Sequence, residues 1–146
     1  MTSTTMTLKI LAAALLYCST FVAAGAADLT VTVDGVKDGG GYVIAAIYDS
    51  ERSFQKRPEA LASFRIRASQ RDVGFSLKNL PPGKYAVGAF HDLNDNGRLD
   101  ADPSGSPTEV YGFSNDARGA GGPPAFAEAA FELGDQAKAI SIRLGY

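Results

Sequence analysis

Short runs in which apolar and polar residues alternate constrain the fold of this chain more than any other feature of its sequence. In one run, Leu29, Val31 and Val33 share one face, while Thr30 and Thr32 share the other. A period of two is the repeat of a β-strand, whose successive side chains point to opposite faces. Clusters of glycine, proline and aspartate separate the runs, which lie at 28–36, 41–49, 63–69, 72–80, 84–92, 129–135 and 137–146. The pattern therefore predicts six or seven short strands.

Strands of this kind favour an all-β fold, and we predict a single antiparallel β-sandwich of about seven strands, immunoglobulin-like in architecture. The 146 residues are enough for one ordinary domain. Tyr85 follows a turn at Pro82 and Gly83. A tyrosine at such a corner packs its ring over the turn and donates its hydroxyl hydrogen to upstream backbone, so we expect a structural role for Tyr85.

The first 26 residues have the layout of a secretory signal peptide. A single early charge, Lys9, precedes an apolar run, and Ala24 and Ala26 have the A-x-A spacing of a cleavage site. We expect cleavage before Ala27, or otherwise before Asp28. The sequence thus predicts a signal peptide at 1–26, one β-sandwich domain at 27–146, and a periplasmic or secreted location.

The predicted mature chain has a modest negative charge and no cysteine. Its formal net charge is −3, because 13 basic residues face 16 acidic ones once Lys9 is removed. Cys18 lies in the predicted signal peptide, so no disulfide is expected. This charge gives no signature of binding to nucleic acid or to an anionic membrane. No later apolar run is long enough for a transmembrane segment.

A long loop is predicted after the strand that ends near His91. Residues 92–125 show little alternation and many Gly, Pro, Asn and Asp residues. A loop of this length in a small domain is usually functional or disordered. We therefore look for functional residues in this segment.

The start of this loop resembles the first nine residues of an EF-hand or dockerin-type calcium loop. Side-chain oxygens stand at alternate positions, and Gly97 permits a sharp turn at the sixth position. Ca²⁺ takes six to eight oxygen ligands. The candidate calcium ligands are Asp92, Asn94, Asn96, the carbonyl of Arg98, and Asp100.

One expected ligand is missing from this pattern. Position 12, where an EF-hand supplies a bidentate glutamate, is Pro103. Asp102 and Glu109 are the candidates to replace it, or water fills the place. The alternative is a polar turn without metal, because Asp, Asn and Gly favour turns for their own reasons. Crowding of four aspartates around Arg98 favours the calcium interpretation.

The only histidine, His91, immediately precedes the acidic loop. An alternative interpretation is therefore a small hydrolase that uses His91 with an acid or serine of the long loop, such as Glu109 or Ser114; Ser104 and Ser106 are also nearby in the sequence. No GxSxG motif surrounds any of the serines. The position of His91 decides between the two, because a histidine that points into the core cannot serve in a cleft.

The segment 106–126 is rich in aromatic and glycine residues. Its side chains either form a recognition surface or fold back over the sandwich as buried plugs. The candidate contacts to a ligand or partner are Tyr111, Phe113, Asn115 and Arg118.

Taken together, the segments 28–36, 41–50, 79–100, 107–119 and 122–133 resemble the uncharacterised secreted bacterial family known as domain of unknown function 2141. The most specific parts are the run from Asn79 to Asp100 and the "YGFSNDARG" segment. The resemblance implies export and a small all-β domain, and implies no established activity. The "LPPGKY" corner is also similar, more distantly, to transthyretin-like and carboxypeptidase-regulatory-like sandwiches.

These observations predict an exported, non-enzymatic β-sandwich with a calcium-stabilised loop. The loop surface would meet an envelope partner or a small ligand. The alternatives are the hydrolase that uses His91 and a passive structural domain without metal.

Overall fold

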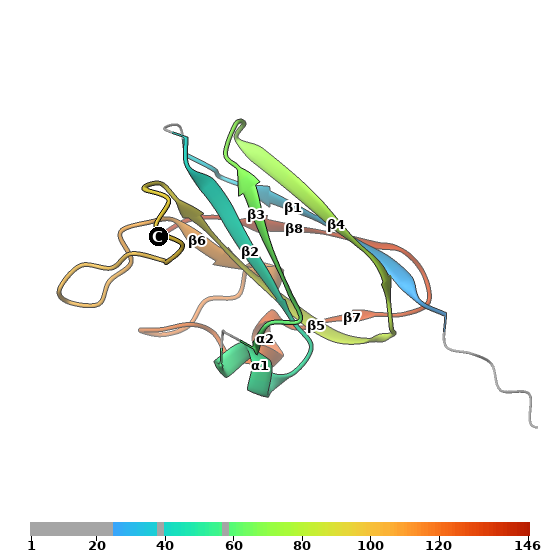
Figure 1. Cartoon of the computed structure of the whole chain (residues 1–146). Coiled ribbons are helices and arrows are strands. Elements are labelled where there is room, and N and C mark those ends of the chain that lie inside the picture. The colour runs from blue at the N-terminus through green and yellow to red at the C-terminus, as the bar shows by residue number, and fades with distance from the viewer. Residues whose placement is uncertain (1–24, 38–39, 57–58) are drawn as a thin grey trace, which may run out of the picture.

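The computed structural model describes residues 25–37, 40–56 and 59–146, and its strands follow the alternating runs of the sequence (Figure 1). The elements are β1 (Ala27–Asp34), β2 (Tyr42–Tyr48), α1 (Glu51–Gln55), β3 (Ala62–Arg67), β4 (Asp72–Leu80), β5 (Gly83–Asp92), β6 (Tyr111–Phe113), the 3₁₀ turn η2 (Ser114–Asp116), α2 (Phe126–Ala129), β7 (Phe131–Leu133) and β8 (Lys138–Arg143). The expected signal peptide at 1–26 lies almost entirely outside the described residues and stays a prediction.

Two sheets stack to form the sandwich. One has three strands in the order β4-β1-β8, and the other has the order β3-β2-β5-β6, with β7 pairing the first part of β5. Every pair is antiparallel except β1 and β8, which run parallel. The prediction of an all-β sandwich is confirmed. The parallel pair is an addition to it, since a period of two does not say which strand lies beside which.

The core lies between the sheets and is built from the inward faces of the strands. Leu29, Val31 and Val33 of β1 are fully buried, and Val43 and Ile47 of β2 face them from the other sheet. Full burial of such a side chain stabilises the fold by about 1.5–3 kcal/mol. The same alternation sends the other face of β2 and β5 away from this core, and that outer face is where the candidate site lies.

Tyr85 closes the corner between β4 and β5, as predicted. Its ring is buried, and its hydroxyl donates a hydrogen bond of 2.7 Å to the carbonyl of Pro81. Burial, with a smaller contribution from Asp49, raises the pKa of the Tyr85 phenol. Tyr85 is therefore a structural anchor for the start of β5.

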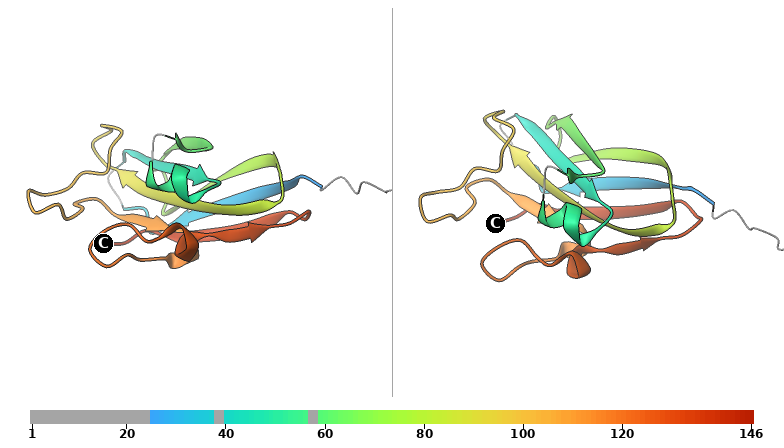
Figure 2. Two further views of the ribbon diagram at one scale, coloured as in Figure 1. Left: turned by 90° about the horizontal axis from the view of Figure 1, so that it is seen from below. Right: turned by 60° about the horizontal axis from the view of Figure 1, so that its bottom comes forward.

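A second, smaller apolar cluster covers one end of the outer face of the five-stranded sheet. Its buried members are Tyr48, Phe54, Ala86, Phe113, Ala117 and Ala129. Phe54 comes from α1, which begins at the N-cap Ser50, whose hydroxyl accepts a hydrogen bond from the amide of Ser53. Figure 2 shows α1 and α2 beside the sheet, while the loop between β5 and β6 extends beyond the end of the sandwich. No helix in the described part of the chain is long and apolar enough to cross a membrane.

Candidate functional site

The outer face of the five-stranded sheet has a row of small side chains across its middle. Ser63, Ala46, Gly88 and Phe113 are directly opposite one another on β3, β2, β5 and β6. The first three are among the smallest residues, so this row is a shallow trough in the sheet surface. Phe113 closes the trough at its β6 end.

Larger side chains stand on both sides of this row. On one side the next outward row contains Ile44, Phe90 and Tyr111, and on the other side Tyr48 faces outward from β2. Ile44 and Tyr48 are four residues apart on one strand, which places them roughly 13 Å apart. A ring-sized group fits between them above Ala46.

Aromatic side chains form the wall at the Tyr48 end. The ring of Phe54 makes edge-to-face contacts with Tyr48, at a centroid distance of 5.2 Å, and with Phe113, at 5.7 Å. Phe126 of α2 completes the cluster at 5.9 Å from Phe54. Because these rings pack edge to face against one another, each restricts the movement of the others in the wall.

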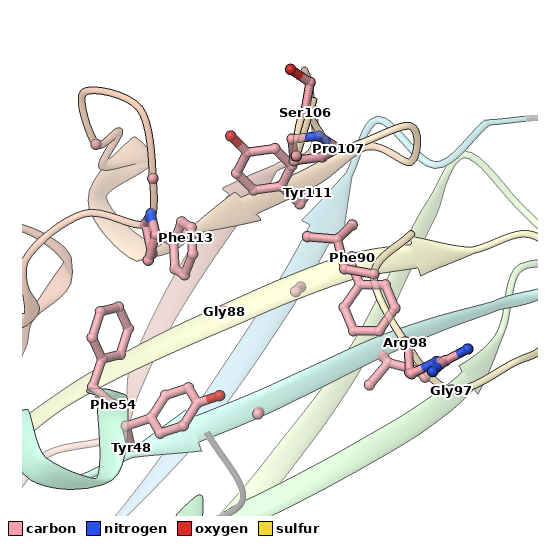
Figure 3. Close-up of a pocket in the computed structure, with 18 of the residues that line it drawn as sticks. Tyr48, Phe54, Gly88, Phe90, Gly97, Arg98, Ser106, Pro107, Tyr111 and Phe113 are labelled. Carbon is pink, nitrogen blue, oxygen red and sulfur yellow. The ribbon is translucent and has the colours of Figure 1, made fainter. Parts of the chain in front are cut away.

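Two loops form the rest of the enclosure, and the result is an open groove of about 910 Å³ (Figure 3). A groove of this size lies in the usual range for small-molecule sites. The loop residues that line it lie at 97–99, 104–107, 119 and 121–123. Of the lining residues that the structure describes, Arg98 is the only charged one.

The acidic loop at the mouth of this groove is held by its own hydrogen bonds. Asp92 is fully buried, and its two carboxylate oxygens accept from the backbone amides of Asn96, at 3.0 Å, and Gly97, at 2.8 Å. The amide nitrogens of Asn94 and Asn96 donate to the carboxylate of Asp100 at 2.7–2.9 Å. These bonds, from Asn96 first and Asn94 second, lower the pKa of Asp100, and the charge of Arg98 adds a smaller effect.

Glu109 fastens the two ends of this loop together. Its side chain is buried, and its carboxylate oxygens accept from the amide of Leu93, at 2.9 Å, and from the amide of Asp100, at 3.1 Å. Asp102 instead organises the next turn, where it accepts from Ser104 and Ser106. The hydroxyl and amide of Ser104 and the amide of Ser106 thereby lower the pKa of Asp102.

The expected calcium ligands are thus brought together, but in the arrangement of a polar turn. Asn94 and Asn96 present N–H donors to Asp100, while their side-chain oxygens accept from the amides of Asn96 and Arg98. A cation needs oxygens at those places, so both amides would have to rotate. Within the described ranges, no three His, Cys, Asp or Glu side chains form a group that could hold a metal ion. Calcium binding stays a prediction.

His91 points into the space between the two sheets and away from the groove. It is fully buried, its Nδ1 accepts from the amide of Lys37 at 3.2 Å, and its Nε2 lies 2.7 Å from the carbonyl oxygen of Gly40. Ser114 is also committed to backbone, since its hydroxyl lies 2.5 Å from the carbonyl oxygen of Ala129 and accepts from the amide of Val87. The arrangement gives no support to a hydrolase that pairs His91 with Ser114 or Glu109.

The four candidate contact residues divide into two pairs. Tyr111 and Phe113 line the groove, as expected for a recognition surface. Asn115 instead donates to the carbonyls of Glu128 and Ala130, and Arg118 donates to those of Tyr111 and Arg143. Asn115 and Arg118 therefore brace the segment behind the groove.

The sequence interpretation did not identify the floor of the groove or its helical wall. Ala46 and Gly88 have no chemical group that marks a site, and Phe54 lies in a stretch without periodicity. The available signal was a small residue on the outward face of each of two apolar strands, because small residues in such places let a ligand or another side chain approach the backbone.

The fold and the groove define this protein as a small β-sandwich with an open apolar pocket on the outer face of one sheet. The chain belongs to the family described as "Uncharacterized protein conserved in bacteria (DUF2141)", whose model matches residues 31–141. This confirms the family resemblance, and the more distant transthyretin-like similarity stays a prediction. No curated protein and no solved structure matches the chain significantly.

Proposed function

We propose that this protein is an exported, non-enzymatic binding module that holds a small apolar ligand in the groove above Ala46 and Gly88. The observation that carries the proposal is the trough of small side chains between aromatic and aliphatic walls, within a space of about 910 Å³. Small-molecule sites are concave, mostly apolar and few per protein. A passive structural domain of the envelope would have no use for an exposed apolar groove of this kind.

Binding of a neutral fluorescent probe tests this proposal. N-phenyl-1-naphthylamine is apolar, and its rings fit the space between Ile44 and Tyr48. We expect saturable binding to the mature protein, with one probe per chain. Ala46→Phe fills the trough and should weaken binding at least tenfold, while Ala46→Ser leaves it open and should bind as the wild type does. Equal binding by both variants would exclude the groove as the site.

We also propose that the loop 92–100 binds Ca²⁺ weakly, with the oxygens of Asp92, Asn94, Asn96 and Asp100 turned inward and the carbonyl of Arg98 completing the set. The supporting observation is that these four side chains already form one hydrogen-bonded network. A cation that binds only the folded loop stabilises the protein by mass action. A dissociation constant of about 10⁻⁴ to 10⁻³ M would be typical of an extracellular site.

Thermal unfolding with millimolar CaCl₂ or with EGTA tests the calcium proposal. We expect calcium to raise the unfolding midpoint of the wild type by several degrees and to leave Asp100→Ala unchanged. MgCl₂ serves as the control for ionic strength and double charge. No shift in the wild type would leave the loop as a polar turn.

Export is the third part of the proposal, and it places the binding module in the periplasm or outside the cell. The support is the signal-peptide layout of residues 1–26. Intact mass and N-terminal sequencing of the fractionated protein are expected to show a chain that begins at Ala27 or Asp28. A full-length chain recovered from the cytoplasmic fraction would contradict it.

A further inference from the structure

The charge of the groove lining indicates what kind of ligand the groove accepts. Among the described residues, its floor and walls are aliphatic or aromatic, its polar groups are hydroxyls and backbone, and Arg98 is the one residue with a formal charge. The described part of the lining contains no acidic side chain. A neutral ligand would leave this cation without a function, whereas a cationic ligand would meet repulsion.

Within the described residues the guanidinium of Arg98 is not held by any hydrogen bond or ion pair, and its charge has only the smaller effect on Asp100 described above. It makes no such bond although five acids lie near it in the sequence, including Asp102, which accepts from Ser104 and Ser106. Each of those acids is committed elsewhere. Asp92 and Glu109 accept from backbone amides, Asp100 accepts from two asparagine amides, and Asp95 pairs with Arg65.

The hydrogen bonds of the loop also fix the backbone position of Arg98. The backbone amide of Arg98 donates to the side-chain oxygen of Asn96 at 2.9 Å, and the preceding Gly97 donates to buried Asp92. Gly97 has a φ of 76°, a conformation that favours glycine. The polar turn therefore presents an arginine at the mouth of an apolar groove, on the side of Phe90 and opposite the wall of Phe54 (Figure 3).

Hydroxyl groups also line the groove, with Ser106 beside Pro107 and away from Arg98 (Figure 3). Ser104 and Ser106 line the groove, and their hydroxyl oxygens lie 3.2 Å apart. Ser104 donates to Asp102, so the Ser106 hydroxyl is the donor in the bond between the two serines, and both hydroxyl hydrogens are already used. The guanidinium of Arg98, with five N–H donors in a planar fork, is therefore the group in the described lining that suits a carboxylate or similar anionic group.

We propose that the ligand of this groove is an amphipathic anion, with a ring-sized apolar body over Ala46 and Gly88 and an anionic group bound by Arg98. This inference rests on the proposed function, since it names the chemical class that the same groove accepts. Arg98 then has a role in specificity, because it selects an acid over the neutral molecule of the same shape.

Two probes with one skeleton test the charge requirement separately from the groove itself. N-phenyl-1-naphthylamine is neutral, and 1-anilinonaphthalene-8-sulfonate adds a sulfonate to the same rings. We expect Arg98→Gln to weaken sulfonate binding about 5- to 10-fold, the scale of one exposed charge-assisted contact, and to change neutral binding by less than about twofold. Arg71→Gln, the matched control, removes the same charge at a residue outside the lining and should leave both affinities unchanged.

The outcomes separate the two proposals. If the neutral probe does not bind the wild type at the groove, the proposed function fails. If both probes bind and Arg98→Gln lowers neither, or lowers both equally, the groove stands and the anion inference is overturned. If Arg71→Gln lowers the affinity for the sulfonate probe as much as Arg98→Gln does, the effect reflects net charge only, and the anion inference is again overturned. Added NaCl provides a second readout, because screening should weaken sulfonate binding to the wild type and leave the neutral probe unaffected.

Discussion

Gly88 and Phe113 lie directly opposite each other on β5 and β6, and the ring of Phe113 leans over the place where a side chain at position 88 would stand. A Cβ at Gly88 would come within 3.1 Å of the Phe113 ring. The glycine thus lets the ring lie across the sheet and end the trough. The position of the aromatic wall depends on the absence of one side chain.

Gly88→Val is expected to disturb both the wall and the groove. Overpacking against Phe113 should lower the free energy of unfolding by about 1–3 kcal/mol, and the displaced ring should weaken binding of the neutral probe. Gly74→Val is the matched control, because a Cβ there meets only the carbonyl oxygen of Val31 at 3.4 Å and strand β4 gains a β-former. Urea unfolding and probe titration of both variants check this, and equal stability of the two would contradict it.

Glu109→Ala should loosen the loop 93–100 by leaving the amides of Leu93 and Asp100 without their acceptor. We expect a loss of about 1–3 kcal/mol in unfolding free energy, together with faster hydrogen exchange at those two amides. Glu132→Ala, at a side chain that is 81% exposed, should change stability by less than about 0.5 kcal/mol. Unchanged exchange at Leu93 and Asp100 would show that Glu109 does not hold the loop.

The substitution His91→Phe tests whether the core face and the outer face of the five-stranded sheet have separate effects on stability and on probe binding. The substitution removes the partner of the Lys37 amide and of the Gly40 carbonyl, and should cost about 2–3 kcal/mol of stability. Probe binding should stay within about twofold of the wild type, because His91 faces the core and the groove lies on the opposite face. A variant that kept its stability and lost binding would reverse this assignment.

The pH dependence of stability should include a contribution from Asp100. Its pKa in the folded protein is below the ordinary value of 3.8, so the unfolded chain binds the proton more readily. This stabilisation is fully present above about pH 5 and is lost as pH falls through the folded pKa. Urea unfolding between pH 7 and pH 3 in EGTA should give a flatter profile for Asp100→Asn than for the wild type. Asp135→Asn makes the same charge change at an exposed turn, and an equally flat profile there would contradict the prediction.

The period of two was enough to predict the seven principal strands, because each has one buried face. It did not reveal β6, because Tyr111–Phe113 lie within a segment without alternation and their order depends on pairing with β5. The same limit applies to the site. Tyr111 and Phe113 were identified by their chemistry, whereas Ala46 and Gly88 matter because they are small and because strand register places them opposite each other. Register is a property of the assembled sheet.

Arg98 is a second residue whose place in the site depends on the folded structure and could not be predicted from the sequence. The sequence interpretation assigned it a backbone carbonyl for a cation, whereas the folded chain places its side chain at the groove. The alternate spacing of the Asp and Asn residues predicted a loop in which their side-chain oxygens converge. It could not predict that the neighbouring acids would all accept from other donors and that, among the described residues, none would form an ion pair with Arg98.

The parallel pairing of β1 with β8 affects the order in which the chain can be completed. Leu29 lies beside Lys138, and Val33 lies beside Ile142, so the central strand of the three-stranded sheet cannot complete its pairing until β8 has been synthesised. Contacts of such long sequence separation are slow to form. Until then β1 has one open edge and an apolar face. The three-stranded sheet is complete only when β8 has paired with β1.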